Sequence, residues 1–343
     1  MLPRSLRLAF GFALCGLVAA KTSAAPDPCQ RELPLAVDVR FHAGERPTSL
    51  PVLTPNGTVY VGTAEGYVHA LAPDGTYLWG YTLRGPVVGE LALGATATVL
   101  VATPRRVYAI RSDGTLLWVF ESPIAVRTGL ASDGTGRFFF ASDDGRLFAL
   151  SGRGALVAHV DGKVPLSTPP VGLGVEIGVG AGRVDGSAIV TLGFKTRRFE
   201  LGGVARELFA CSGVAFCALV NREVLGVADE GARFRHTALY ASAARDRLAV
   251  LAKPRVLEVY TAGQRAFSAE LSAEASAAPL VDPRGRVFVP LENGALVGFS
   301  ETGARIGCAK IADSPLETPV FDGARGRVWV TAREGWVSAV EGN

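Results

Sequence analysis

A short strand-turn-strand pattern recurs along this 343-residue chain, and it restricts the possible folds more than any other feature. In its first copy, from Val59 to Leu71, two runs of β-branched and aromatic residues flank Glu65-Gly66, where the glycine suits the positive φ of a tight hairpin. Close copies span 138–150, 287–299 and 328–340, and weaker copies span 99–110 and 248–260. The pattern predicts a series of β-hairpins.

The spacing of the hairpins indicates the architecture. They end at Leu71, Ile110, Leu150, about Leu192, Val227, Tyr260, Phe299 and Val340, a period of roughly 40 residues. Short strands at this period are typical of propeller blades, because each sheet buries its faces against its neighbours around an axis. Glycine and turn residues interrupt the chain too often for helical repeats. We predict an all-β fold, an eight-bladed β-propeller of four-stranded antiparallel blades.

The two ends of the chain predict how the ring closes. The last repeat has no fourth strand, and the alternating residues of 33–41 predict a strand near the N-terminus. We expect 33–41 to be the outer strand of the last blade, with Val37 and Val39 paired with the strand that ends at Val340, which leaves no open edge. The expected units are 47–84, 85–122, 123–162, 163–203, 204–236, 237–272, 273–311 and the incomplete 312–343. Within 163–272 the pattern is weakest, and the repeat alone leaves the count open by one.

Residues 1–24 predict a cleaved secretory signal peptide. Arg4 and Arg7 precede an apolar run over 8–20, and small residues follow at the cleavage position. That run is too short for a transmembrane anchor, since about 20 residues are needed to cross a bilayer. A lipoprotein with acylated Cys15 is the less favoured alternative, because the large Leu14 precedes the cysteine. The mature chain, 25–343, is predicted to be a single propeller domain.

Net charge argues against a nucleic-acid partner. The formal charge of the whole chain is +3, and three basic residues and no acid lie within 1–24. The mature chain is therefore neutral, which gives no charge-based reason to bind DNA or an acidic membrane surface.

Two units carry a further motif after the hairpin. Ala70-Leu-Ala-Pro-Asp-Gly-Thr-Tyr-Leu-Trp79 and Ala109-Ile-Arg-Ser-Asp-Gly-Thr-Leu-Leu-Trp118 share an acidic residue, a glycine and a tryptophan four residues later. This resembles the PQQ-like repeat of the β-propeller superfamily that contains the quinoprotein dehydrogenases and non-catalytic relatives of the BamB type. The residues expected to define the repeat structurally are Gly66, Gly75, Trp79, Gly114, Trp118, Gly145, Gly294, Gly303 and Gly335.

The catalytic set that the resemblance would imply for a quinoprotein dehydrogenase is not visible. Such an enzyme needs two adjacent cysteines, a calcium ligand set and an aspartate base, and the sequence has no adjacent cysteines. Asp143-Asp144-Gly145 fits a hairpin turn better than a calcium loop. The histidines, His42, His69, His159 and His236, lack metal-ligand spacing, and the glycines of 172–178 lack the strand-to-helix context of a dinucleotide site.

Four cysteines remain after the leader is removed: Cys29, Cys211, Cys217 and Cys308. In an oxidising compartment they allow three disulfide pairings. A Cys211–Cys217 bridge would close a small loop across Ser212-Gly213 and leave Cys29 with Cys308.

The sequence supports two hypotheses of function. The first is a monomeric, periplasmic or secreted, non-catalytic scaffold without a cofactor that binds a protein or a cell-envelope component. The alternative is a PQQ-dependent quinoprotein-type oxidoreductase or a cofactor binder, and the missing catalytic set counts against it.

Overall fold

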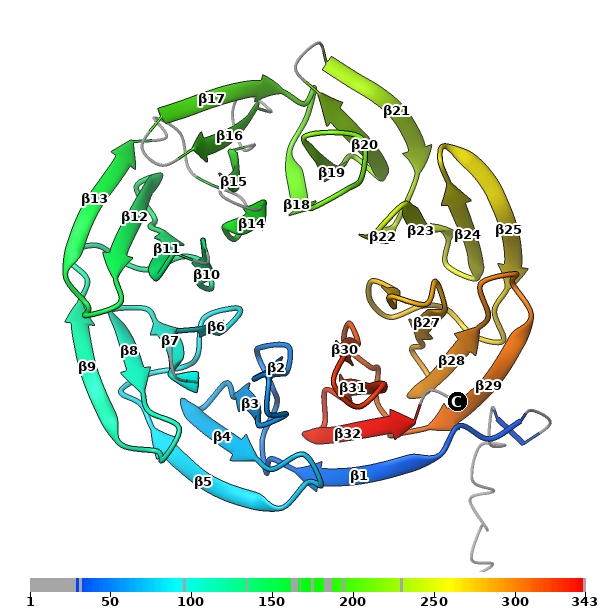
Figure 1. Ribbon diagram of the computed structural model, residues 1–343, viewed down its shortest axis with the longest axis horizontal. Helices are drawn as coiled ribbons and strands as arrows, with labels where there is room; N and C mark the ends of the chain where they lie inside the picture. Colours follow the sequence, from blue (N-terminus) through cyan, green and yellow to red (C-terminus); the bar gives the residue numbers. More distant parts are fainter. Residues whose placement is uncertain are drawn as a thin grey trace, which may run out of the picture.

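The strands form a closed ring of small sheets (Figure 1). The structure is a computed structural model, and it describes residues 29–30, 33–94, 97–133, 135–161, 166, 168–173, 176–181, 187–192, 195–228 and 231–341. In this part of the chain, hydrogen bonds join the strands into eight four-stranded sheets. Seven sheets contain four consecutive strands each, and the last joins β1 to β30, β31 and β32.

The sheets are called blades 1 to 8 in the order of their innermost strands. Blade 1 contains β2 (Val52–Leu53), β3 (Val59–Gly62), β4 (Tyr67–Leu71) and β5 (Tyr77–Thr82), and blade 2 contains β6 (Ala92–Leu93), β7 (Val99–Thr103), β8 (Arg106–Ile110) and β9 (Leu116–Glu121). Blade 3 contains β10 (Ala131–Ser132), β11 (Arg137–Ala141), β12 (Arg146–Ser151) and β13 (Leu156–Asp161), and blade 4 contains β14 (Val171–Leu173), β15 (Glu176–Ala181), β16 (Ser187–Leu192) and β17 (Lys195–Glu200). Blade 5 contains β18 (Ala205–Phe209), β19 (Phe216–Val220), β20 (Glu223–Ala228) and β21 (Gly231–Thr237), and blade 6 contains β22 (Tyr240–Ala244), β23 (Arg247–Lys253), β24 (Val256–Thr261) and β25 (Gln264–Glu270). Blade 7 contains β26 (Leu280–Val281), β27 (Val287–Pro290), β28 (Ala295–Phe299) and β29 (Arg305–Lys310), and blade 8 contains β30 (Val320–Asp322), β31 (Arg327–Thr331), β32 (Trp336–Glu341) and β1 (Val37–His42).

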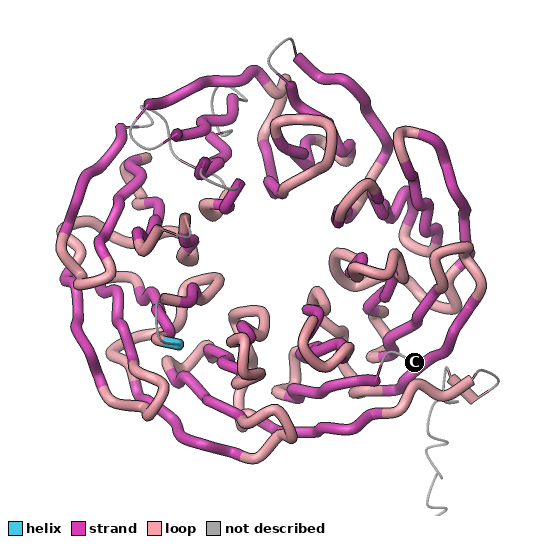
Figure 2. The backbone as a smooth tube through the Cα atoms, viewed as in Figure 1, coloured by secondary structure: helices cyan, strands magenta, loops and turns pink. Residues whose placement is uncertain are grey.

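The blades share one plan, which Figure 2 shows as strands that alternate with short loops from the centre to the rim. Neighbouring strands within a blade are antiparallel; in blade 1, for example, Val59 lies opposite Leu71 and Ala70 lies opposite Trp79. The middle strands are buried on both faces, and apolar clusters fill the space between neighbouring blades. The predicted all-β fold of four-stranded antiparallel blades is confirmed.

One contact recurs where an outer strand meets the next blade. Trp79 on β5 lies against the β8–β9 turn of blade 2, and its indole Nε1 donates to the carbonyl of Ser112 at 2.8 Å. Gly114 in this turn has φ +86°, and a Cβ there would lie 2.9 Å from the indole Cγ, so the packing requires glycine. Trp118 repeats the arrangement on blade 3, where its Nε1 donates to Gly152 O at 3.0 Å.

The ring closes through β1, which pairs with β32 in a register that places Val37 opposite Val340 and Val39 opposite Ala339. The predicted bounds of this strand, 33–41, are wrong. The strand is Val37–His42, and the residues before it lie on blade 7 instead: the amide of Leu35 donates to Cys308 O, and the amide of Cys308 donates to Leu33 O, both at 2.9 Å. The change of blade falls between Leu35 and Ala36, because the carbonyl of Ala36 accepts from the amide of Glu341 on blade 8.

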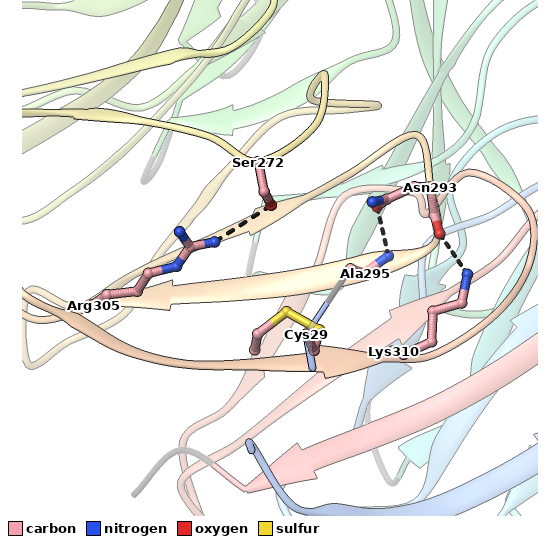
Figure 3. Close-up of a disulfide and its surroundings, with 7 residues drawn as sticks. Cys29, Ser272, Asn293, Ala295, Arg305 and Lys310 are labelled. Carbon is pink, nitrogen blue, oxygen red and sulfur yellow. Dashed lines mark hydrogen bonds between the residues drawn. A yellow bond between two sulfur atoms is a disulfide. The ribbon is translucent and has the colours of Figure 1, made fainter. Parts of the chain in front are cut away.

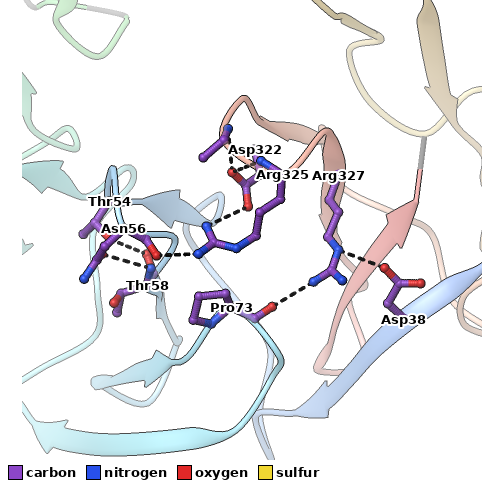
Figure 4. Close-up of polar contacts among 9 residues, drawn as sticks. Asp38, Thr54, Asn56, Thr58, Pro73, Asp322, Arg325 and Arg327 are labelled. Carbon is purple, nitrogen blue, oxygen red and sulfur yellow. Dashed lines mark hydrogen bonds and ion pairs between the residues drawn. The ribbon is translucent and has the colours of Figure 1, made fainter. Parts of the chain in front are cut away.

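A disulfide between Cys29 and Cys308 fastens the same N-terminal segment to β29 (Figure 3). A second set of links at the closure consists of arginines (Figure 4). Arg327 on β31 pairs with Asp38 on β1 at 2.9 Å and donates to Pro73 O of blade 1 at 3.1 Å, while Arg325 donates to Asn56 O at 2.8 Å. Blades 7, 8 and 1 are thus joined by covalent and polar contacts.

Candidate functional site: the central pocket and the apolar rim

The connections between blades lie at the same end of the ring as the turns between the two middle strands. Backbone hydrogen bonds show this directly, since the amide of Leu83 donates to Gly66 O and the amide of Ser122 donates to Arg105 O. Several of these connections enclose a pocket of about 510 Å³, which is lined by Gly89, Glu90, Arg127, Thr128, Gly129, Ser142, Asp143, Leu166, Pro169 and Val204. The pocket therefore collects residues from the connections that enter blades 2, 3, 4 and 5.

Glu90 is the most perturbed acid of this pocket. It is surrounded by the protein although it lines the pocket, and burial raises the pKa of its carboxyl to about 7. A hydrogen bond from the Leu50 amide to Oε2 at 2.8 Å opposes the shift, and the charges of Glu317 and Glu207 add to it. Burial also raises the pKa of Glu207 to about 7, against the charge of Arg206. Near neutral pH these carboxyls are partly protonated.

One cation is among the described lining residues of the pocket, and it is paired with an acid. Arg127 and Asp143 form an ion pair at 3.5 Å. Among the described lining residues, Glu90 is the group whose charge changes near neutral pH, and none is a histidine. Such a site can bind a polar group or respond to pH.

The glycines singled out in the sequence all lie in turns. Positive φ is found at Gly66, Gly75, Gly114, Gly145, Gly294, Gly303 and Gly335. Asp143-Asp144-Gly145 is the β11–β12 turn, with Asp144 paired to Arg146 at 3.2 Å. Of the glycines in 172–178, Gly172 and Gly178 belong to the antiparallel strands β14 and β15, and Gly174 lies outside the described residues. Among the described residues, no group of three or more His, Cys, Asp and Glu side chains could hold a metal ion.

The histidines do not form a common site. His42 contacts Trp336, His69 lies between Phe41 and the tyrosines of blade 1, His159 contacts Phe148, and His236 stacks on Tyr260. Burial lowers the pKa of His69, and neither of its ring nitrogens has a hydrogen-bond partner among the described residues. These rings are packing elements of separate strands.

The cysteines are paired as Cys211–Cys217 and Cys29–Cys308. The first pair closes the β18–β19 loop, and the second connects residues 279 positions apart. The predicted leader 1–24, including Cys15, lies outside the described residues. Within the part of the chain that the structure describes, no helix has the length and apolarity to span a bilayer.

A second surface lies on the outside of the ring. Of the ten large apolar side chains that are exposed in the described ranges, seven lie on the outer strands of blades 1 to 3: Tyr77, Leu78, Leu116, Leu117, Val119, Leu156 and Val157. Tyr77, Leu116 and Leu156 occupy one register position, opposite Leu71, Ile110 and Leu150. We call these seven residues the apolar rim. The corresponding strand of blade 6 begins with Gln264 and Arg265, so the rim does not extend to that blade.

The ring of four-stranded antiparallel sheets defines a β-propeller. A family model described as "Outer membrane protein assembly factor BamB" matches residues 39–158, which span blades 1 to 3. Over these residues the match supports the PQQ-like repeat that the sequence predicts. No curated protein matches the chain.

Three solved structures share the fold. BamB from Moraxella catarrhalis is 14% identical with a TM-score of 0.72, and the match covers 90% of this chain and 100% of that one. The computationally designed Ika8 protein is 15% identical (TM-score 0.74; 89% and 99% covered), and Sqt1 from Saccharomyces cerevisiae is 13% identical (TM-score 0.70; 91% and 100% covered). At these identities the similarity establishes the fold alone.

Sequence reasoning missed both surfaces. Glu90 could have been noticed as a lone acid within the apolar stretch 87–93, but its proximity to Glu207 and Glu317 depends on ring geometry. The rim had a clearer signal, because Tyr77-Leu78 and Leu116-Leu117 follow Asp-Gly-Thr turns where polar residues are expected on an outer strand.

Proposed function

We propose that this protein is a non-catalytic scaffold, periplasmic or secreted, that binds a partner protein along the apolar rim of blades 1 to 3. The observation that carries the proposal is the gathering of exposed apolar side chains at one register position in three successive blades. Contiguous exposed apolar surface of this kind is typical of interaction sites. The leader 1–24, the single domain 25–343 and the monomeric state belong to the same proposal.

The partner fits best as an extended segment. The outer strand of a blade has an open backbone edge, and such an edge can accept another strand. The chain itself provides an example, since Leu33 and Leu35 form backbone hydrogen bonds with Cys308 on β29. A partner strand beside β9 would gain the same bonds and would cover Leu116 and Leu117 with its own apolar side chains.

The location of the protein is supported by its disulfides. Bridges such as Cys29–Cys308 persist in the periplasm or outside the cell, where thiols are oxidised. A BamB structure with this fold is consistent with a role in the envelope.

Photocrosslinking tests the proposed surface. A photoreactive residue at Leu117 should capture a partner protein in the envelope fraction, and one at Ala266, the equivalent position on β25 of blade 6, should not. A triple variant, Leu78→Glu, Leu117→Glu and Val157→Glu, should lose the captured partner while its melting temperature stays within a few degrees of the native value, because the three side chains are exposed.

The matched control is Ala266→Glu, which adds a charge at the same position of a blade without the rim. The proposal is wrong if the triple variant still binds the partner as tightly as the native protein, or if crosslinks form at Ala266 and not at Leu117.

A further inference from the structure

The contact between an outer strand and the next blade follows a rule. Trp79 covers Gly114, Trp118 covers Gly154, Phe267 covers Gly303 and Val39 covers Gly75; in each pair a Cβ on the glycine would lie within 3 Å of the covering side chain. All four side chains occupy the same register position on their outer strand. At these four junctions an apolar side chain fills the slot between a blade and the next turn, whereas the same register position holds Ala158 on β13 and Gly307 on β29.

The junction between blades 5 and 6 breaks this rule. Phe234 occupies the covering position on β21, opposite Gly226. Its ring lies back on its own sheet, because a Cβ on Gly226 would be 2.1 Å from the ring Cε1. The turn that it should cover is one residue shorter, since Tyr260 pairs with Arg265 whereas Leu71 pairs with Tyr77. A Cβ on Gly263 of this turn would contact nothing within 4 Å.

An open pocket of about 320 Å³ occupies this junction. Its aromatic lining consists of Phe234, His236 and Tyr260, with the His236 and Tyr260 ring centroids 3.9 Å apart. Tyr260 is held in place by its hydroxyl, which donates to Glu258 Oε2 at 2.6 Å. The loop closed by the Cys211–Cys217 disulfide forms another wall. The lining is therefore fixed by a covalent bridge and by ring packing.

The charged residues of the pocket are mostly cationic. Arg233, Arg245 and Arg247 line it together with a single acid, Asp246. Arg247 is anchored, since its Nη1 donates to Gly285 O and Glu301 O. Arg233 and Arg245 are exposed, and neither forms an ion pair with another described residue. Two guanidinium groups are thus available beside an aromatic slot.

We propose that this pocket binds a small planar aromatic molecule that carries a carboxylate. The ring would fill the slot that an indole or phenyl side chain fills at other junctions, and it would stack on His236 and Tyr260. The carboxylate would pair with Arg233 and Arg245, because guanidinium groups match carboxylates with two parallel hydrogen bonds. The volume is at the lower end of the range for small-molecule sites.

Titration calorimetry with 1-naphthoate tests the pocket in the full mature protein. The native protein should bind one equivalent with a Kd below about 1 mM. The double variant Arg233→Gln, Arg245→Gln should weaken binding at least about tenfold, the effect of losing charge-assisted hydrogen bonds. The uncharged analogue 1-naphthalenemethanol should bind the native protein at least about tenfold more weakly than 1-naphthoate. It should have the same affinity for the native protein and for the double variant.

Two further variants locate the effect. Ala243→Leu places a larger side chain in the pocket and should abolish binding, and Arg235→Gln should leave it unchanged, because Arg235 on the same strand pairs with Glu223 and does not line the pocket. The proposal is overturned if the native protein does not bind 1-naphthoate at millimolar concentration. It is also overturned if the double variant and Ala243→Leu both retain native affinity.

Discussion

The closing junction of the ring and the junction between blades 1 and 2 hold neighbouring blades together by different means. Between blades 1 and 2 the chain is continuous, and Trp79 packs on the Gly114 turn. At the closure the chain is not continuous, and three devices occur together: the β1–β32 ladder, residues 33–35 on β29, and the Cys29–Cys308 disulfide. Where covalent continuity is missing, backbone pairing and a cross-link replace it.

Deleting 25–41 should have the largest effect. The deletion removes most of β1, exposes the edge of β32 and loses several ladder bonds, each contributing about 0.5–1.5 kcal/mol, together with the buried side chains of Leu35 and Val39. This is comparable with the stability of many domains. We expect aggregation or a large fall in melting temperature, measured by light scattering and calorimetry. A monomeric protein that melts within a few degrees of the mature chain would contradict this role of the closure.

Removing the closing disulfide should have the next largest effect. In the chain-entropy model, a bridge across 279 residues stabilises by about 5.6 kcal/mol, and one across a loop of six by about 2 kcal/mol. Cys29→Ser with Cys308→Ser should therefore lower the free energy of unfolding more than Cys211→Ser with Cys217→Ser, measured by urea denaturation. Equal losses in the two double variants would show that the closure gains little from its cross-link.

Trp79→Ala tests the continuous junction. Losing the indole and its hydrogen bond to Ser112 should lower the free energy of unfolding by about 2–3 kcal/mol. This is at or below the usual loss for a buried tryptophan truncated to alanine, because the ring is only half-buried. The blades should stay together, since the chain still connects them, so the variant should remain monomeric. Leu78→Ala, at the exposed neighbouring position, is the control and should change the melting temperature little. Ring opening in Trp79→Ala would remove the distinction between the two junctions.

The smallest effect concerns Glu90, which ties the connection into blade 1 to the connection into blade 2 through the Leu50 amide. Its pKa is raised from 4.5 to about 7, so the folded state binds the proton more tightly than the unfolded state. The stabilisation is complete below pH 4.5 and is lost as pH rises through about 7. Native protein should melt lower at pH 8 than at pH 6, and Glu90→Gln should reduce this difference. A pH dependence that is identical in the variant would exclude Glu90 as its source.

The repeat made much of the framework predictable. Each close copy of the hairpin has its own glycine, and the Asp-Gly turn followed by tryptophan encodes the contact of Trp79 with blade 2 within one repeat length. These signals are local, so a single sequence contains them. The pairing of β1 with β32 could also be predicted, because the last repeat lacks a fourth strand and the N-terminal segment contains a strand that belongs to no other repeat.

The rest depends on contacts that no local pattern encodes. The sequence pattern predicts one strand of the last blade over 33–41, but residues 33–35 pair with Cys308 on the preceding blade, and the chain changes blade between Leu35 and Ala36. The slot left open by Phe234 arises from a glycine in its own sheet and a shortened turn in the next. The carboxyls that act on Glu90 come from β18 (Glu207) and from the connection between β29 and β30 (Glu317), and only the ring brings them together.

The pairing of β1 with β32 also fixes the order of events when the protein folds. Strand β1 is the first described strand to be synthesised, and its partner is the last. Closing a loop of nearly the whole chain has a high entropic cost, and contacts of such long sequence separation form slowly. The apolar residues of β1 must therefore wait unpaired until the final blade has formed, whereas the Cys29–Cys308 bond requires only blade 7. During that interval the chain is most exposed to aggregation and to mispairing with a second copy.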